Sequence, residues 1–499
     1  MFAATLRKIR QAFRRPAAVE PSLHPPRREP PRRQARRWEA AETTRLNSAH
    51  WTNAADNSLN SDLAAKLAIL RARCALEIAN NPWVDGAVET HAGDVVGPHG
   101  PRLDVQSDSD RFNERLETLW TDWTADPTTR RDLDLAGTLR LWVRDLWTTG
   151  DLLGQMTSRK NPPGPLALAL RLIPPRRLGT PYAAAGQANI CLGVERAGDG
   201  APVAYHVDDP EFFGASEVST RSRRILARWI LHYFKVTEAE QARGFPWLSP
   251  CLDAMADLRD FDAETLDAAR QAADMAVFWY TDHQDVAPMV VNESTEIERR
   301  QQQTGPPGWK PQQLTPQQPN TVYNDYRAER LRELGRPVGM PLMTVRLDST
   351  NHNYSSARFD GQNYNRGLET VQAWLSAQPL RRLVDELAAE ATAANFLPKR
   401  PPRVVYAWTW PVRPHVDPAK EANAEKTRLA NGTLTYSAAL AAHGTTLETV
   451  IAQRRRENRL LADAGLPPLP TWPAPPPTAA APPSRGFTVP VPANGHARP

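Results

Sequence analysis

A helix-forming segment from Ser249 to Tyr280 is too long to be enclosed in the core of an ordinary domain. Ser249 is a typical N-cap residue and Pro250 suits the first helical position, so the expected start is well marked. About 31 residues at about 1.5 Å each would span roughly 45 Å. The apolar stripe of this helix includes Leu252, Met255, Ala269 and Ala273. Because alanine allows helices to approach closely, we expect this stripe to pack against another helix, although an ordinary core helix would show the same periodicity.

The rest of the 499-residue chain has the pattern of a mixture of helices and short strands. The length predicts roughly two to four structural units. Apolar spacing predicts a helix over residues 61–97 that breaks at Asn81-Pro82, and two more helices near 111–123 and 135–147. Between residues 166 and 232, short alternating pieces separated by turn residues predict strands. The expected fold class is α+β, mainly helical.

Beyond residue 280, polar segments alternate with helix-forming ones. Residues 281–319 are rich in glutamine and contain GPPGWKP, which predicts an extended polar excursion, with a plain linker as the alternative. A helix near 321–334 and a loop rich in Gly and Pro should follow, and then helices from about Ser356 to Phe396 with an interruption at Pro379. An extended VVYAWTWPV piece precedes three expected helices, at 418–430, 435–443 and 446–464.

Positive charge is concentrated at the N-terminus. Residues 1–37 contain eleven Lys or Arg against two Glu, whereas the whole chain has a formal net charge of only +5, so the remainder is slightly acidic. The arm over residues 1–49 is expected to be basic and largely disordered. It could contact nucleic acid or capsid partners, and a solvated terminus is equally compatible with its composition. Residues 467–499 are rich in proline and are expected to form a disordered tail.

The sequence contains no recognisable motif for enzymatic chemistry. P-loop, dinucleotide-binding, HExxH and GxSxG patterns are absent. Cys74, Cys191 and Cys251 are far apart and in no CxxC spacing, which disfavours a disulfide framework or a zinc site. His232 alternates with apolar neighbours in RWILHYF and is expected to be a satisfied strand histidine. We therefore expect no catalytic residue, no metal, no cofactor and, without a long apolar run or a signal-peptide pattern, no membrane insertion or export.

Three strings occur in an order that carries a resemblance to a known family. LRARCALEIANNPWVDGAVETHAGDVVG at residues 70–97 has an Asn-Asn-Pro break and a closing Val-Val-Gly. EQARGFPWLSP at 240–250 contains a Q-x-R-G-x-P turn before the long helix, and NYSSAR at 353–358 precedes another helix. In this order they resemble the lambda-type family of tailed-bacteriophage portal proteins, over roughly residues 45–465.

The resemblance implies a portal fold that assembles into a ring, usually of twelve subunits, through which double-stranded DNA enters and leaves the capsid. Its regions would be a wing at 50–247, a first stem helix at 248–280, a clip at 281–319, a second stem helix at 320–335, a tunnel loop at 336–356, a channel helix and wing return at 357–417, and a crown at 418–466. A chain of this kind is expected at the portal vertex of the virion, after assembly in the cytoplasm of a bacterial host.

The resemblance also implies which residues meet partners. The tunnel-loop residues that would approach DNA, or alternatively hold the loops of neighbouring subunits together, are Arg346, Asp348, Asn351, His352 and Asn353. The clip residues that would meet partners are Gln301, Gln302, Gln303, Trp309 and Lys310. The implied partners are further copies of the chain, the terminase large subunit, the major capsid and scaffold proteins, and head–tail adaptor or neck proteins. Two alternatives stay open at this point: another head–neck structural protein such as an adaptor, and a DNA-processing enzyme such as a nuclease.

Overall fold

The structure is a computed structural model whose contacts divide the chain into a unit at Met1–Asn57 and a unit at Ser58–Pro499. It describes residues 45, 48, 49, 52, 54–181, 184, 186–187, 189–208, 222–274, 278–280, 310–312, 322–350, 353–411, 418–442, 445 and 447–467. All the elements below belong to the second unit. None of the helices in these ranges is both long enough and apolar enough to cross a membrane. The expected basic arm and proline-rich tail lie almost entirely outside the described residues.

The first two helices meet at Asn81, as the sequence predicts. Helix α2 (Leu59–Asn80) ends where Asn81 turns to an extended conformation, and α3 (Pro82–Val96) begins at the next residue. The Asn81 side-chain oxygen accepts a hydrogen bond from the Trp83 backbone N–H at 3.1 Å, which caps α3. Pro82 occupies the first helical position, where its missing N–H costs nothing. The predicted break is therefore confirmed, and one residue both ends α2 and starts α3.

Antiparallel sheets supply the β part of the fold. Strand β2 (Asp151–Ser158) lies between β3 (Leu168–Leu172) and β8 (Ile230–Phe234). A four-stranded sheet has the order β4 (Ile190–Cys191), β5 (Val194–Arg196), β6 (Pro202–Asp208) and β7 (Ser222–Leu226). Strand β1 (Arg102–Ser107) pairs with β11 (Val404–Thr409), although about 300 residues separate them. The mixed α+β class expected from the sequence is confirmed.

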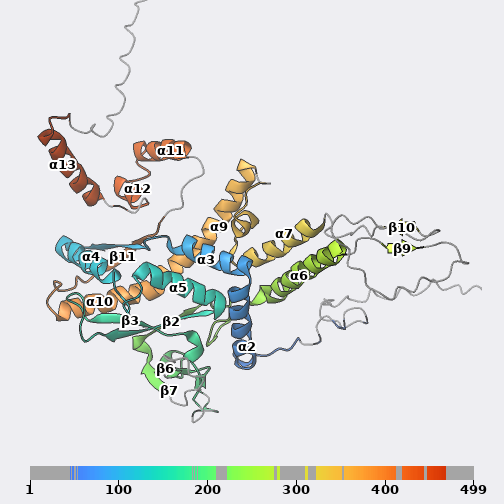
Figure 1. The fold of residues 1–499 in the computed structure, drawn as a ribbon. Coiled ribbons are helices and arrows are strands. Elements are labelled where there is room, and N and C mark those ends of the chain that lie inside the picture. Colours follow the sequence, from blue (N-terminus) through green and yellow to red (C-terminus); the bar gives the residue numbers. More distant parts are fainter. Residues whose placement is uncertain are drawn as a thin grey trace, which may run out of the picture. The chain divides into compact units, whose positions relative to one another are not determined.

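The main core forms where helices cover the β2–β3–β8 sheet (Figure 1). The helices concerned are α3, α4 (Asp110–Thr124), α5 (Leu135–Thr148) and α10 (Arg381–Ala393). Trp142 and Trp147 on α5 and Phe112 on α4 are fully buried there. Aromatic side chains of this size bury the most apolar area per residue, so this layer provides much of the hydrophobic stabilisation.

The predicted long helix is shorter than expected at both ends. Residues Ser249–Cys251 form a single 3-10 turn whose N-cap is Leu248, so the expectation that Ser249 caps the helix is wrong. Helix α6 runs from Leu252 to Asp274, which is roughly 35 Å. Phe278–Tyr280 form strand β9, which pairs with β10 (Lys310–Gln312), and are not helical. Three consecutive aromatic residues favour an extended backbone, and pairing with β10 satisfies their backbone groups.

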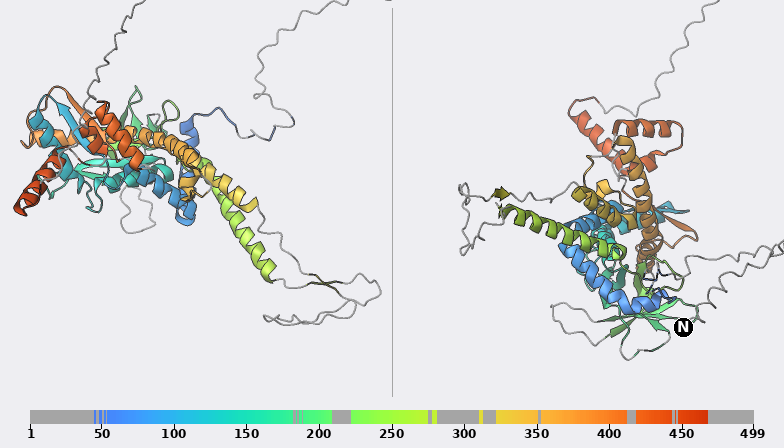
Figure 2. Two further views of the ribbon diagram at one scale, coloured as in Figure 1. Left: turned by 90° about the horizontal axis from the view of Figure 1, so that it is seen from above. Right: turned by 90° about the vertical axis from the view of Figure 1, so that its right-hand side faces the viewer.

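Helix α7 (Val322–Gly335) returns beside α6 and leads through a 3-10 turn (Arg336–Val338) into the short helix α8 (Leu342–Arg346). Both views of Figure 2 show α6 and α7 side by side. Helix α9 (Tyr354–Leu375) continues through a π-helical turn at Ser376–Leu380 into α10. The predicted interruption at Pro379 is thus a π turn within one continuous helical run, since the wider turn accommodates the proline.

Three C-terminal helices agree closely with those expected, and they are α11 (Pro418–Ala430), α12 (Tyr436–Ala442) and α13 (Leu447–Asp463). Gly432 has a φ of 69°, the left-handed conformation that commonly ends a helix. The backbone N–H of Gly432 donates to the carbonyl of Leu429, which closes the end of α11. Local capping signals were therefore sufficient to place these helices.

Candidate functional site

An ion cluster forms around the fully buried Asp151, the first residue of β2. Arg71 of α2 donates to Asp151 Oδ2 at 2.6 Å, and Nε of Arg243 donates to the same oxygen at 2.9 Å. The backbone N–H of Gly244 donates to Oδ1 at 2.6 Å, and His232 Nε2 lies 3.2 Å from Oδ1. Asp151 is 0 % exposed, so both carboxylate oxygens are satisfied by the protein alone. We call these five residues the Asp151 cluster.

Arg243 extends the cluster to the second sheet. Its guanidinium also donates to the carbonyls of Pro175, Leu178 and Leu192, at 2.9–3.1 Å. The Q-x-R-G-x-P turn therefore joins α2, both sheets and the start of α6 at one point. Gly244 and Gly150 permit this closeness, because a Cβ on Gly244 would overlap the Gly150 backbone and one on Gly150 would overlap Phe245.

The electrostatics of the Asp151 cluster fit a structural role. Burial would raise the pKa of Asp151, but Arg243, His232 and Arg71 outweigh it and hold the pKa below its usual range. Burial also lowers the pKa of His232, against the opposing effect of Asp151. An Asp–His pair of this kind can serve catalysis. Here the carboxylate faces two arginines and a backbone amide, and the described rings beside the histidine are those of Tyr205 and Phe234. His232 is the satisfied strand histidine that its sequence pattern predicted.

Asp145 on α5 is a half-buried carboxyl close to this cluster. Burial, and then the charge of Asp151, raise the pKa of Asp145 to about 7. The pKa of this carboxyl is higher in the folded protein than in the unfolded chain, where it is about 4. Its contribution to stability is therefore fully present below about pH 4 and is lost as the pH rises through about 7. About half of the Asp145 carboxyl groups are therefore neutral at pH 7, and the disfavoured charged form predominates only above that pH.

Replacing Asp145 with asparagine should stabilise the protein at pH 8 by about 1–3 kcal/mol, because it removes the cost of ionisation in a half-buried position. The gain should shrink as the pH falls from 7 to 4, where the parent carboxyl becomes neutral. Thermal unfolding of the two proteins across this pH range measures the difference. An equal difference in melting temperature at pH 5 and pH 8 would show that Asp145 is not a costly charge.

Helices α6 and α7 form an antiparallel pair that is packed at one end only. Cys251 Sγ donates to the Glu333 carbonyl at 3.3 Å, and Leu252, Met255 and Leu258 are buried. Phe261 stacks on Tyr323, with ring centroids 5.7 Å apart, and lies 4.7 Å from the Tyr326 ring. The Tyr323 hydroxyl donates to Asp262 at 2.8 Å. The predicted pairing of these two helical segments is confirmed.

The second half of α6 extends past its partner. Helix α7 begins at Val322, level with Asp262, so residues 263–274 of α6 have no α7 residue beside them in the described part of the chain. Leu266 there is 52 % exposed, and Ala269 is half-buried. Of the predicted packing residues, Leu252 and Met255 are buried, and the side chain of Ala273 lies outside the described ones.

The segment predicted as a flexible loop at 336–356 is more ordered than expected. It contains helix α8, and Met340 and Val345 are buried. The loop ends at Asn353, whose Oδ1 accepts from the Ser356 backbone N–H at 2.8 Å and caps α9. Asn353 was predicted to approach DNA; the structure shows that it caps the helix, and its approach to DNA stays a prediction. The expectation that helix resumes near Ser356 is corrected to Tyr354, because Asn353 supplies the cap.

The structure places the remaining predicted loop residues only in part. Arg346 and Asp348 form an exposed ion pair at 3.4 Å, and Asp348 Oδ1 also accepts from the Thr350 hydroxyl at 2.7 Å. Asn351 and His352 lie outside the described residues. Among the clip residues, Lys310 is exposed on β10, and the others, Gln301, Gln302, Gln303 and Trp309, are likewise not described.

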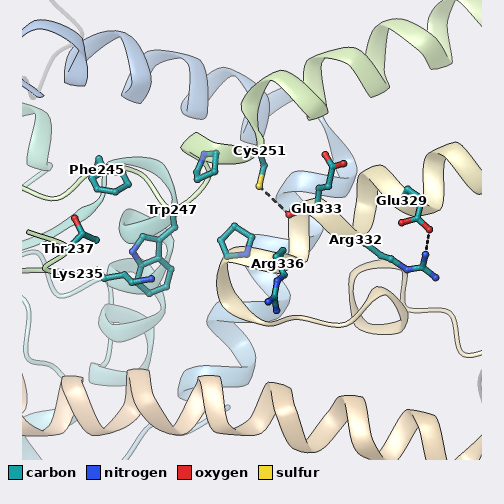
Figure 3. A pocket seen from close by; sticks show the side chains of 11 residues that line it. Lys235, Thr237, Phe245, Trp247, Cys251, Glu329, Arg332, Glu333 and Arg336 are labelled. Atoms are coloured by element: carbon teal, nitrogen blue, oxygen red, sulfur yellow. Dashed lines mark hydrogen bonds and ion pairs between the residues drawn. The ribbon is translucent and has the colours of Figure 1, made fainter. Parts of the chain in front are cut away.

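A pocket of about 760 Å³ opens where the Q-x-R-G-x-P turn meets α7 (Figure 3). Phe245 and Trp247 line one side, and Arg336 and Glu333 line the other. Glu329 forms an ion pair with Arg332 at its edge. The α7 residues that line the pocket carry both signs of charge, and the thiol of Cys251 at its wall donates to the Glu333 carbonyl. Sequence reasoning missed this pocket because its walls lie about 90 residues apart in the chain.

A half-covered helix pair, an ordered loop and a closed ion cluster define the class: a structural subunit whose function lies in its surfaces. The family description "Phage portal protein, lambda family" matches residues 44–372, which is well over half of the chain. The chain therefore belongs to the lambda family of phage portal proteins. This family is structural rather than catalytic. The matched range includes the Asp151 cluster, α6, α7 and the loop up to α9.

The individual relatives named here are between 11% and 23% identical to this chain. The probable portal protein of Halomonas phage phiHAP-1 is 23% identical over 494 residues, which covers 91% of this chain and 90% of the relative. Among solved structures, a neck of an empty gene transfer agent particle is similar with a TM-score of 0.45 and 14% identity, covering 81% of this chain and 94% of that one. An HK97-family phage portal protein from Corynebacterium diphtheriae is similar with a TM-score of 0.34 and 11% identity, covering 70% and 96%.

Proposed function

We propose that the chain forms a closed ring, of about twelve copies, whose channel passes double-stranded DNA during packaging and ejection. The observation that carries this proposal is the incomplete packing of α6. Most helical stability in proteins comes from burial of one face, and residues 263–274 lack a partner helix in the described chain. Neighbouring copies in a ring would supply that partner.

The regions of the ring follow the order of the elements. In this proposal the wing is 50–247 and is rejoined by 357–417, consistent with the pairing of β1 and β11 across these ranges. The stem is the α6–α7 pair within 248–280 and 320–335, and the clip is 281–319. The tunnel loop then narrows to 336–353, because Tyr354 already belongs to α9. The crown is 418–466, formed by α11, α12 and α13.

Charge supports a conduit rather than a DNA trap. A duplex carries one phosphate charge per about 1.7 Å, and neutralising about six to ten phosphates produces tight, salt-sensitive binding. Outside the basic N-terminal residues the chain is slightly acidic. The loop presents Arg346 already paired with Asp348, so its net charge toward DNA is small. Weak contacts of this kind allow the duplex to slide.

The proposed partners follow from the same assignment. A portal ring at the capsid vertex would contact the major capsid and scaffold proteins through the wing. The clip, with Gln301–Gln303, Trp309 and Lys310, would bind the terminase large subunit during packaging and a head–tail adaptor or neck protein later. Assembly in the cytoplasm of the bacterial host and residence in the virion belong to this proposal.

Electron microscopy of the purified protein tests the ring directly, and we expect closed rings with a central channel. Ala269→Leu should hinder closure, because overpacking a close helix contact costs about 1–3 kcal/mol per site. Ala424→Leu, at an exposed alanine of α11, is the matched control and should leave rings intact. A parent chain that is strictly monomeric at micromolar concentration and moderate salt would overturn the proposal. Normal rings from Ala269→Leu would show that Ala269 does not face a neighbouring helix.

A further inference from the structure

Leu347 is held in an unfavourable conformation at the tip of the loop. It follows α8 with a φ of 49°, in the left-handed region that glycine or asparagine normally occupies at a helix end. Its side chain is 80 % exposed, the highest value among the large apolar residues described. A branched apolar residue in this position is strained and also solvated, so the isolated chain gains nothing from it.

Phe359 is a second exposed apolar residue in the same part of the chain. It lies on α9, two turns after the Asn353 cap, and is 63 % exposed. Within the described residues from 336 to 380, Leu347 and Phe359 are the only large hydrophobic residues with high exposure. Because both side chains are mostly solvated, they do not cover each other within one copy.

The residues flanking these two positions carry matching charges. The loop reads Arg346-Leu347-Asp348, and the helix reads Arg358-Phe359-Asp360. On helix α9, Arg358 and Asp360 lie on opposite flanks of Phe359. If Leu347 meets Phe359 in the orientation that brings Arg346 to the Asp360 flank, each arginine lies beside an aspartate, and in the reverse orientation like charges meet. The Arg346–Asp348 pair is exposed, and such pairs are weak enough to exchange partners. The surfaces are therefore complementary in charge as well as apolar.

We propose that Leu347 of one copy docks on Phe359 of a second copy of this chain, with Arg346 beside Asp360 and Asp348 beside Arg358. This inference rests on the proposed ring, because two different patches that match each other form a heterologous contact, and such contacts close into rings. The contact would tie each loop tip to the next copy's α9. It would also explain why a strained leucine is retained where glycine would fit.

Cysteine cross-linking tests this contact. Leu347→Cys and Phe359→Cys are combined in one chain, assembled into rings and oxidised. The expected result is a ladder of covalently linked copies in non-reducing electrophoresis. The two single variants and the parent are the controls. Cys74 and Cys251 are buried and Cys191 is half-buried, so the parent should give no ladder.

The outcomes separate this inference from the ring itself. Rings that form without a ladder overturn the docking and leave the proposed function intact. A ladder from Leu347→Cys alone overturns it too, because it would place the loop tips against one another. A parent that forms no rings overturns both. A disulfide formed within one copy would leave a monomer that migrates as a single compact band. That result would show a contact within one copy and would also overturn the proposal.

A second variant measures the role of the leucine without cysteine chemistry. Leu347→Gly relieves the backbone strain and removes the apolar contact. We expect the isolated chain to unfold at an equal or higher temperature, and the assembled ring to dissociate at a lower denaturant concentration. A lower unfolding temperature of the isolated chain would mean that Leu347 serves its own copy. Unchanged ring dissociation would also contradict the docking.

Discussion

Replacing Arg243 with alanine is expected to lower the free energy of unfolding by about 3–5 kcal/mol, among the largest effects of any single substitution in this chain. The change leaves the fully buried Asp151 short of its best partner and removes the donors of three buried carbonyls. Chemical denaturation followed by tryptophan fluorescence at pH 7 measures this change in the free energy of unfolding. Arg243→Lys keeps the positive charge but lacks the planar guanidinium with its several N–H donors. It should therefore recover only part of the lost stability.

An exposed arginine provides the matched control for this prediction. Arg400 pairs with Asp385 at 2.9 Å on the surface, and Arg400→Ala should cost less than about 1 kcal/mol. The pH dependence has a definite sign. The pKa of Asp151 is depressed, so its stabilisation is present above its unfolded pKa of about 4 and is lost as the pH falls further. A parent and an Arg243→Ala variant of equal stability at pH 7 would rule out the Asp151 cluster as a structural centre.

Adding positive charge at residues 350–352 should have the largest effect on function. We expect Thr350→Arg, Asn351→Arg and His352→Arg together to slow DNA packaging or ejection at least about tenfold at low salt. About three added charges per copy, repeated around a ring, would bind phosphates by release of counterions. The effect should weaken steeply between about 50 and 200 mM salt. These substitutions leave Asn353 and the Arg346-Leu347-Asp348 segment unchanged, so ring assembly should stay normal.

The control for the loop prediction places the same charge elsewhere. Thr118→Arg, Thr121→Arg and Ala125→Arg lie on exposed positions at the end of α4 and add as many charges per copy. This variant should package and eject DNA at nearly the parent rate. If the loop variant also works at the parent rate at low salt, residues 350–352 do not face the channel. The assignment of 336–353 as the tunnel loop would then be withdrawn.

Local signals predicted much of the fold correctly. The Asn81-Pro82 break and the three C-terminal helices were expected from such signals, whereas the pairing of α6 with α7 was implied by the resemblance. A cap or a proline acts on residues within one helical turn, so its effect can be inferred from neighbouring letters alone. The strings that resembled the portal family lie in the same segments, and family membership was confirmed over residues 44–372.

The errors fell where local preferences conflicted or where contacts were distant. Phe278–Tyr280 continued a helical pattern in the sequence, but pairing with β10 made them a strand. The capping of the first turn of α9 by the Asn353 side chain was not foreseen from the sequence. The residues assigned to DNA and to partner proteins stay predictions.

By itself the sequence determined the helical segments, the mixed class and the family, because each depends on neighbouring residues or on strings in a fixed order. Only the tertiary structure decided what the Q-x-R-G-x-P turn does. Asp151 and Arg243 stand 92 residues apart and meet only when both sheets and α2 are in place. Only the tertiary structure, too, showed that Leu347 and Phe359 are exposed and that no described helix packs beside the end of α6. Exposure depends on what the rest of the chain covers, and that cannot be read from a residue's own neighbours.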